Sequence, residues 1–132
     1  MKIYSFFFEF NIFKHNLLLE FAQITNKNDF FYQNYGKIKV YGGGEDGNIT
    51  PGEHNPPHFH IEMNNVEIQV IIPSNIDDEL KTINGELNSK LIKDLRKWFK
   101  MPFKTDRNKN NYEALKEYWN TLNDGDENVN KI

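Results

Sequence analysis

The stretch HNPPHFHIEMNNVEIQVII, residues 54–72, alternates polar and apolar residues along most of its length, which is typical of half-buried β-strands. Asn64 and Asn65 interrupt it and favour a two-residue hairpin turn, because asparagine tolerates the positive φ angle that such turns require. The predicted cross-strand pairs are Met63–Val66, Glu62–Glu67, Ile61–Ile68, His60–Gln69 and Phe59–Val70. A shift of one residue would turn every apolar side chain to the opposite face, so this register is strongly specified.

This hairpin would have one apolar face and one polar face. The apolar face would carry Phe59, Ile61, Met63, Val66, Ile68, Val70 and Ile72. The polar face would carry His58, His60, Glu62, Glu67 and Gln69. We expect that the core does not need the polar face, which makes it the first candidate for a functional site.

The rest of the chain predicts an α+β fold. Alternating aromatic residues predict a strand at residues 3–10, and helical spacing of apolar residues predicts a helix at residues 12–24. Residues 26–34 are polar and turn-prone, Lys37 to Tyr41 form a short strand, and residues 73–85 form a turn-rich acidic connection.

Two amphipathic helices are expected near the C-terminus. Apolar residues from Leu87 to Phe99 have helical spacing, with Asn88 or Ser89 near the cap, and a second helical pattern runs from Tyr112 to Leu122. We predict a small antiparallel sheet, centred on the hairpin, that packs its apolar face against these two helices. Trp98, Phe99 and Trp119 fit core positions.

Length and composition favour a single domain over residues 1–132. We expect residues 123–132 to be a frayed tail. The absence of cysteine excludes a disulfide framework and a thiolate metal site, and it suits a cytoplasmic protein. Glu9, Lys14 and His15 interrupt the apolar N-terminus, which argues against a signal peptide or a membrane span.

The formal net charge of -3 gives no general sign of nucleic-acid binding, but the basic residues are clustered. Residues 90–109, the basic segment, have a local charge of +6. The predicted contacts to nucleic acid or to an acidic protein are Lys90, Lys93, Lys97, Lys100 and Arg107. The alternative is a solvated helix face with no partner.

Three histidines fall within seven residues, at His54, His58 and His60. Residues two apart on a strand point to the same side, so His58 and His60 could bind a divalent metal such as Zn, Ni, Mn or Fe, with His54 or Glu62 as a third ligand. In a second interpretation the imidazoles act as general acid and base in metal-free RNA cleavage. Lys37, Lys39 or the helix lysines would then hold the phosphate, and Tyr41 would orient it. In a third interpretation the histidines only stabilise the fold.

The run His54-Asn55-Pro56-Pro57-His58-Phe59-His60-Ile61-Glu62 resembles the signature of a small bacterial family, domain of unknown function four-one-six-zero. The resemblance extends over residues 37–122, so it implies a family-like core there, with residues 1–35 as an N-terminal strand and helix extension outside it. It implies a short protein encoded beside another small gene, as part of a toxin–antitoxin pair, and it brings no established reaction. The first hypothesis is therefore a cytoplasmic, toxin–antitoxin-like protein with a histidine-lined site that acts as an RNase or a metal-dependent hydrolase. The alternative is a non-catalytic module that binds an acidic protein or nucleic acid.

Overall fold

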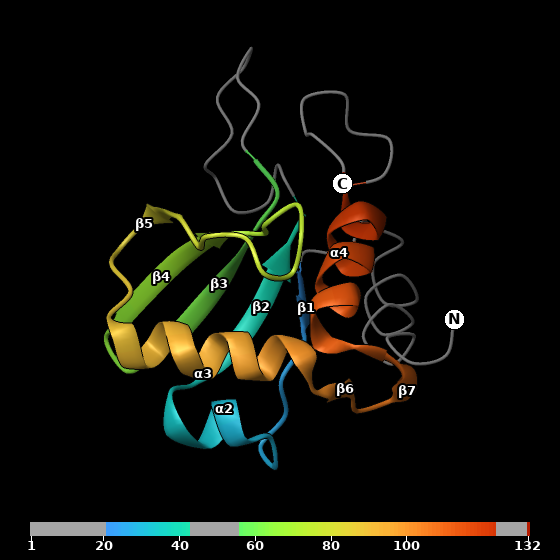
Figure 1. The fold of residues 1–132 in the computed structure, drawn as a ribbon, viewed down its shortest axis with the longest axis horizontal. Helices are drawn as coiled ribbons and strands as arrows, with labels where there is room; N and C mark the ends of the chain where they lie inside the picture. The colour runs from blue at the N-terminus through green and yellow to red at the C-terminus, as the bar shows by residue number, and fades with distance from the viewer. Residues whose placement is uncertain (1–20, 43–55, 124–131) are drawn as a thin grey trace.

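The computed structural model describes residues 21–42, 56–123 and 132, and within them the fold is α+β (Figure 1). The larger sheet is an antiparallel meander of five strands in chain order: β1 (Phe21–Gln23), β2 (Lys37–Tyr41), β3 (His58–Met63), β4 (Val66–Ile71) and β5 (Thr82–Asn84). The helices are α2 (Phe30–Asn34), α3 (Ser89–Lys100) and α4 (Asn111–Leu122). A small second sheet, β6 (Pro102–Phe103) and β7 (Asp106–Asn110), connects α3 to α4.

The central hairpin of β3 and β4 has the predicted register. All five predicted pairs, from Met63–Val66 to Phe59–Val70, are present. Asn65 has a φ angle of 54°, in agreement with the expected turn. The period-two pattern and the turn chemistry therefore specified this part of the fold correctly.

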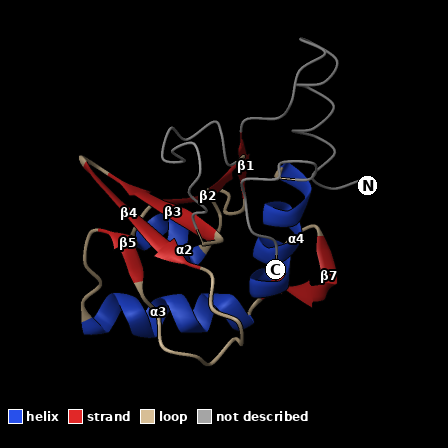
Figure 2. Cartoon of the chain, turned by 90° about the horizontal axis from the view of Figure 1, so that it is seen from above, coloured by secondary structure: helices blue, strands red, loops and turns tan. Residues whose placement is uncertain are grey.

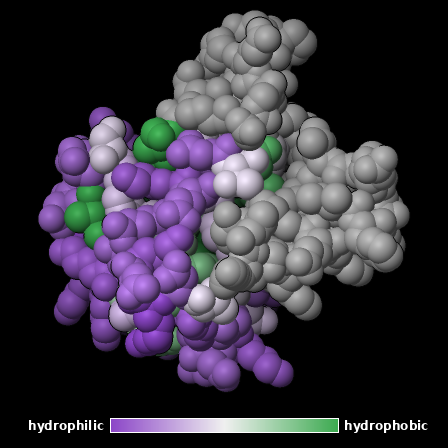
Figure 3. All heavy atoms as spheres, turned by 90° about the vertical axis from the view of Figure 1, so that its right-hand side faces the viewer, coloured by the Kyte–Doolittle hydropathy of each residue, from purple (hydrophilic) through white to green (hydrophobic). Residues whose placement is uncertain are grey.

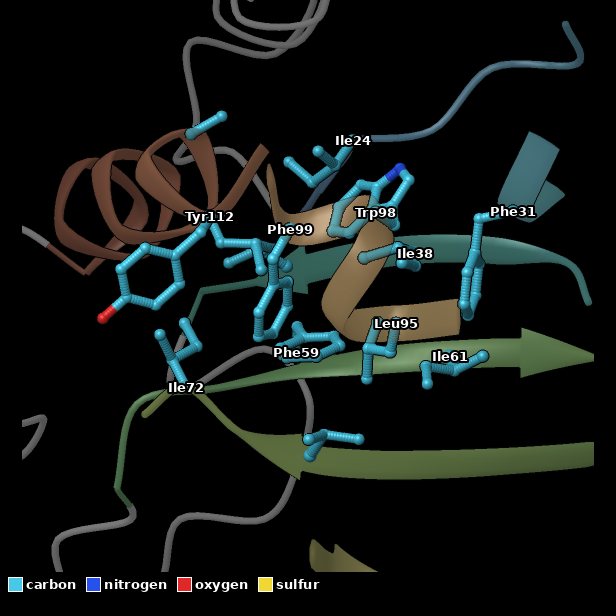
Figure 4. Packing of buried hydrophobic residues seen from close by; sticks show 14 of the residues in the cluster. Ile24, Phe31, Ile38, Phe59, Ile61, Ile72, Leu95, Trp98, Phe99 and Tyr112 are labelled. Carbon is cyan, nitrogen blue, oxygen red and sulfur yellow. The ribbon is translucent and has the colours of Figure 1, made fainter. Parts of the chain in front are cut away.

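The apolar face of the sheet packs against α3, which runs across the strands on one side (Figures 1 and 2). Leu95 and Phe99 of this helix lie over Phe59 and Ile61 of β3, and the rings of Phe59 and Phe99 are 6.0 Å apart (Figure 4). Helix α4 lies beside β2. Trp98, Phe99 and Trp119 are fully buried, so their predicted core positions are confirmed.

Asparagine residues begin both C-terminal helices. The Asn88 side chain accepts a hydrogen bond from the Leu91 amide at 2.8 Å, which confirms the predicted cap of α3. Asn110 and Glu113 form a reciprocal capping box at the start of α4. These caps explain why the helices begin where they do.

Several predicted boundaries were wrong. Residues 21–23 belong to strand β1 and not to a helix, because Phe21, Ala22 and Gln23 pair with Tyr41, Val40 and Lys39 of β2. Part of the turn-prone segment 26–34 forms helix α2, the acidic connection contains β5, and β6 and β7 follow α3. Asn123, expected in a frayed tail, is buried. The predicted strand at residues 3–10 lies outside the described residues.

The surface on the α4 side of the molecule is mostly hydrophilic where it is described, with small separate apolar patches (Figure 3). Among the described residues, no helix has the length and apolar character needed to cross a membrane. The large apolar side chains are instead gathered between the sheet and its helices.

Candidate functional site

The histidine face is the polar side of strands β2, β3 and β4. It contains Lys39, Tyr41, His58, His60, Glu62, Glu67 and Gln69. The backbone register places Lys39 opposite His60 and Glu62 opposite Glu67. The structure thus brings together three of the four predicted metal ligands, His58, His60 and Glu62. The fourth, His54, lies outside the described residues.

His60 is paired with a carboxylate. Its Nδ1 lies 3.0 Å from Glu67 Oε2, although Glu67 is diagonal to it and Gln69 is directly opposite. An ionised carboxylate only accepts hydrogen bonds, so this contact favours a proton on Nδ1 and makes Nε2 the lone-pair nitrogen of the neutral ring. The Tyr41 ring packs against the imidazole at 4.5 Å between centroids. Carboxylate and aromatic ring together fix the tautomer and the orientation of His60.

His58 is oriented in a similar way by the backbone. Its Nδ1 lies 2.9 Å from the carbonyl oxygen of Pro56, which only accepts hydrogen bonds and therefore places the proton on Nδ1. The Trp119 ring lies against the imidazole at 5.2 Å, and the His58 and His60 rings are 5.3 Å apart. Both histidines consequently have Nε2 as the lone-pair nitrogen of the neutral ring. The contact with Trp119 was missed, because helical spacing shows only that Trp119 is a core residue.

Glu62 has two hydrogen-bonding partners on the same face. Tyr41 donates its hydroxyl to Oε2 at 2.6 Å, and Lys39 Nζ lies 3.1 Å from Oε1. Burial of the carboxylate acts to raise its pKa, but the bonds from Tyr41 and Lys39 outweigh burial and hold the pKa of Glu62 below its ordinary value. Glu62 is therefore a carboxylate at neutral pH, and Lys39 offsets its charge.

Exposure of the face increases along β3 toward the hairpin turn. His58 and His60 are only 1% and 3% exposed. The side chains of Glu62 and Glu67 are 25% and 46% exposed. The expectation that the core does not need this face was therefore wrong at its histidine end, where Gln69 is buried as well. Only the carboxylate end is open to solvent.

The described residues contain no group of three or more His, Asp or Glu side chains arranged to hold a metal ion. The Nδ1 contacts of His58 and His60 are of the kind that metal-binding histidines commonly make, with Nδ1–H donated to a carbonyl or a carboxylate. Glu62, the predicted third ligand within this range, is bonded to Tyr41 and Lys39 instead.

The basic segment is exposed but partly neutralised. Lys90 pairs with Asp94 at 2.9 Å and Lys100 with Asp77 at 3.0 Å, while Lys97 lies over the Phe30 ring. Lys93 and Arg107 are exposed on α3 and β7. Asp94 is already counted in the local charge of +6, but Asp77 lies outside the segment, so the field that a partner would meet here is weaker than +6 indicates. Binding of nucleic acid or protein by this segment stays a prediction.

Comparison of the chain with models of known protein families, with curated proteins and with solved structures gives no match.

Proposed function

We propose that the chain is a cytoplasmic, toxin–antitoxin-like protein whose histidine face cleaves RNA by acid–base catalysis. The observation that carries this proposal is the contact between His60 Nδ1 and Glu67 Oε2 at 3.0 Å. A carboxylate bonded to one ring nitrogen orients the imidazole and stabilises the imidazolium that forms when the other nitrogen takes a proton. The toxin–antitoxin setting, with a partner protein encoded nearby, rests on the resemblance of residues 54–62.

In the proposed reaction, His60 Nε2 removes the proton from a ribose 2′-hydroxyl. The 2′-oxygen then attacks the adjacent phosphorus, and the bond from phosphorus to the 5′-oxygen breaks. His58, protonated on both ring nitrogens, gives its Nε2 proton to the leaving oxygen. The products are a cyclic 2′,3′-phosphate and a free 5′-hydroxyl, so protons and bonds balance without a cofactor.

Two carboxylates on the face would repel a polyanion if they were unpaired. His60 is neutral when it acts as the base, so it offsets the charge of Glu67 only after Nε2 has taken the 2′-hydroxyl proton. Lys39 offsets the charge of Glu62 from the start. This pairing lowers the electrostatic cost of bringing a phosphodiester to the exposed end of the face. Because both histidines are buried, substrate reaches them only when the structure around the rings opens, and we expect this step to limit turnover.

The test is an RNA cleavage assay on the purified full chain in the presence of a chelator. Glu67→Gln keeps the size of a half-exposed side chain and removes its charge, so the fold should persist, as circular dichroism would verify. We expect activity to fall by up to roughly 10²- to 10⁴-fold, the contribution of a well-positioned general base. Glu86→Gln, at an exposed glutamate outside the face, is the matched control and should retain full activity. Equal activity of Glu67→Gln and wild type would refute the proposed role of the pair.

A metal-dependent hydrolase is the second candidate, and the matching Nδ1 contacts of His58 and His60 favour it. In that case the two Nε2 atoms would bind a divalent cation such as Zn, Ni, Mn or Fe. Mass spectrometry of the untagged protein should then find near-stoichiometric metal that is lost in the His58→Ala/His60→Ala double variant. An RNA cleavage rate that is unchanged by a chelator, and unchanged again when each metal ion is added back, would exclude this candidate.

A further inference from the structure

A pocket of about 490 Å³ opens at the end of the sheet where the β3–β4 turn lies beside the connection from α2 to β2. Its lining includes Tyr32, Tyr35 and Lys37 from one side and Glu62 and Asn64 from the other. The volume is within the range of roughly 300–1,000 Å³ that is usual for small-molecule sites. Glu62 belongs both to this pocket and to the histidine face, so the two are adjacent.

Lys37 is the cationic side chain in the lining of the pocket, which also includes the Glu62 carboxylate. It is opposite Glu62 in the register of β2 and β3, but the Glu62 carboxylate is bonded to Lys39 and Tyr41. Within residues 21–42 and 56–123, Lys37 forms an ion pair with no carboxylate, unlike Lys39. A cation in this position favours an anionic group, such as a phosphate, in the ligand.

The wall that carries the tyrosines is held in place by contacts outside the pocket. Tyr35 donates its hydroxyl to Asp94 of α3 at 2.5 Å, and its ring packs on buried Phe31 at 4.7 Å. Gly36 lies so close to β3 that a Cβ atom would be 2.2 Å from the Glu62 carbonyl oxygen. The α2–β2 connection is therefore fixed against the sheet. It presents aromatic side chains beside Lys37, a combination that suits a base together with its phosphate.

We propose that this pocket binds one nucleotide of a single-stranded RNA, with the phosphate at Lys37 and the base against Tyr32. The inference rests on the proposed function, because it makes the pocket a substrate subsite of the histidine face. Glu62 is two residues from His60 along β3, which corresponds to about 7 Å. An RNA strand with one nucleotide bound in the pocket would thus continue toward the His60–Glu67 pair from the exposed end of the histidine face.

Binding can be measured apart from cleavage with a fluorescein-labelled single-stranded deoxyoligonucleotide, which lacks the 2′-hydroxyl needed for the reaction. Fluorescence anisotropy of the full chain gives its dissociation constant at several salt concentrations. Tyr32→Ala should weaken binding about 5- to 100-fold, whereas Tyr32→Phe should bind as wild type does. Lys37→Gln should weaken binding and reduce the slope of log affinity against log salt by about 0.7, the value for one phosphate on a single strand.

Two controls identify the group that is recognised. Lys81→Gln, at an exposed lysine outside this pocket, should change neither affinity nor salt slope. Adenosine 5′-monophosphate should displace the probe at a lower concentration than inorganic phosphate. If inorganic phosphate displaces the probe at the same concentration as adenosine 5′-monophosphate, and Tyr32→Ala does not change the affinity for the probe, the pocket is a simple anion site. That result would overturn the nucleotide proposal.

The outcomes separate this inference from the proposed function. Binding that depends on Lys37 and Tyr32 without any RNA cleavage would support the pocket and refute the catalytic proposal. Cleavage that depends on Glu67, with affinity and KM unchanged in Lys37→Gln and Tyr32→Ala, would support catalysis and refute the pocket. Loss of affinity in Lys93→Gln but not in Lys37→Gln would place the nucleic acid on the basic segment instead and would also refute the pocket.

Discussion

The Asp29 carboxylate joins two helices and offers a quantitative test of the packing. One oxygen, Oδ1, accepts a hydrogen bond from the Phe31 amide at 2.8 Å and caps α2. The other, Oδ2, accepts a hydrogen bond from Trp98 Nε1 of α3, also at 2.8 Å. Since Trp98 is fully buried, its indole N–H has no access to bulk water.

The expected cost of Asp29→Ala follows from these two bonds. Loss of a helix cap costs about 1 kcal/mol, and a buried donor left without an acceptor costs about 1–3 kcal/mol. We therefore expect the free energy of unfolding to fall by about 2–4 kcal/mol. Asp29→Asn retains one carbonyl oxygen for two donors, so it should lose about 1–3 kcal/mol and isolate the contribution of the second bond.

Urea denaturation followed by tryptophan fluorescence measures both losses. Asp77→Ala is the control, because Asp77 and its partner Lys100 are 73% and 57% exposed, and such pairs contribute at most about 1 kcal/mol. A loss in Asp29→Ala no larger than in Asp77→Ala would show that the connection between α2 and α3 does not stabilise the fold as described.

Three further predictions concern stability and pH. Gly36→Ala should lower the free energy of unfolding by about 3 kcal/mol or more, because its φ angle is +145° and the new Cβ would meet the Glu62 carbonyl; an unchanged melting temperature would contradict the contact. The pKa of Glu62 is lowered in the folded protein, so the ionised carboxylate stabilises the fold at pH values above its ordinary pKa of 4.5. This stabilisation is lost as the pH falls through the folded-state pKa. Glu62→Gln should therefore be less stable than wild type at neutral pH and should lose less stability on acidification. Urea denaturation of both proteins at several pH values measures this, and coincident plots of unfolding free energy against pH would disprove it. Tyr112→Phe removes the buried hydrogen bond from the tyrosine hydroxyl to the Pro73 carbonyl and should lower the free energy of unfolding by about 1–3 kcal/mol in the same assay. An unchanged free energy of unfolding would contradict a stabilising role for that bond.

The hairpin and both C-terminal helices could be predicted because local signals agree with tertiary packing there. Alternation set the faces of β3 and β4, Asn64 and Asn65 set the turn, and Asn88 marked the start of α3. Phe21 and Ile24 are three residues apart, a spacing that fits a helix. Pairing with β2, which no local pattern reveals, makes residues 21–23 a strand. The strands β5 and β6 have only three and two residues, and β7 is polar throughout, so none of them shows a recognisable periodicity.

The sequence predicted which residues share the histidine face but not which of their side chains form ion pairs or hydrogen bonds with one another. Sequence register places His60 opposite Gln69, and Glu62 opposite Glu67. In the structure the ionic contacts are diagonal, between His60 and Glu67 and between Lys39 and Glu62. Like charges directly opposite each other are unfavourable, and the diagonal contacts relieve that repulsion. The choice depends on side-chain rotamers and burial, which alternation alone does not determine.

The central claim is that Glu67 holds His60 with Nε2 as its basic nitrogen, since both the acid–base and the metal-binding proposals depend on this tautomer. The most direct measurement is the nitrogen-15 chemical shifts of the imidazole rings, recorded by NMR for wild type and for Glu67→Gln. We predict that neutral His60 carries its proton on Nδ1 in wild type, and that part of the population changes to the Nε2–H tautomer in Glu67→Gln. A wild-type His60 protonated on Nε2, or a tautomer that does not respond to Glu67→Gln, would contradict the claim.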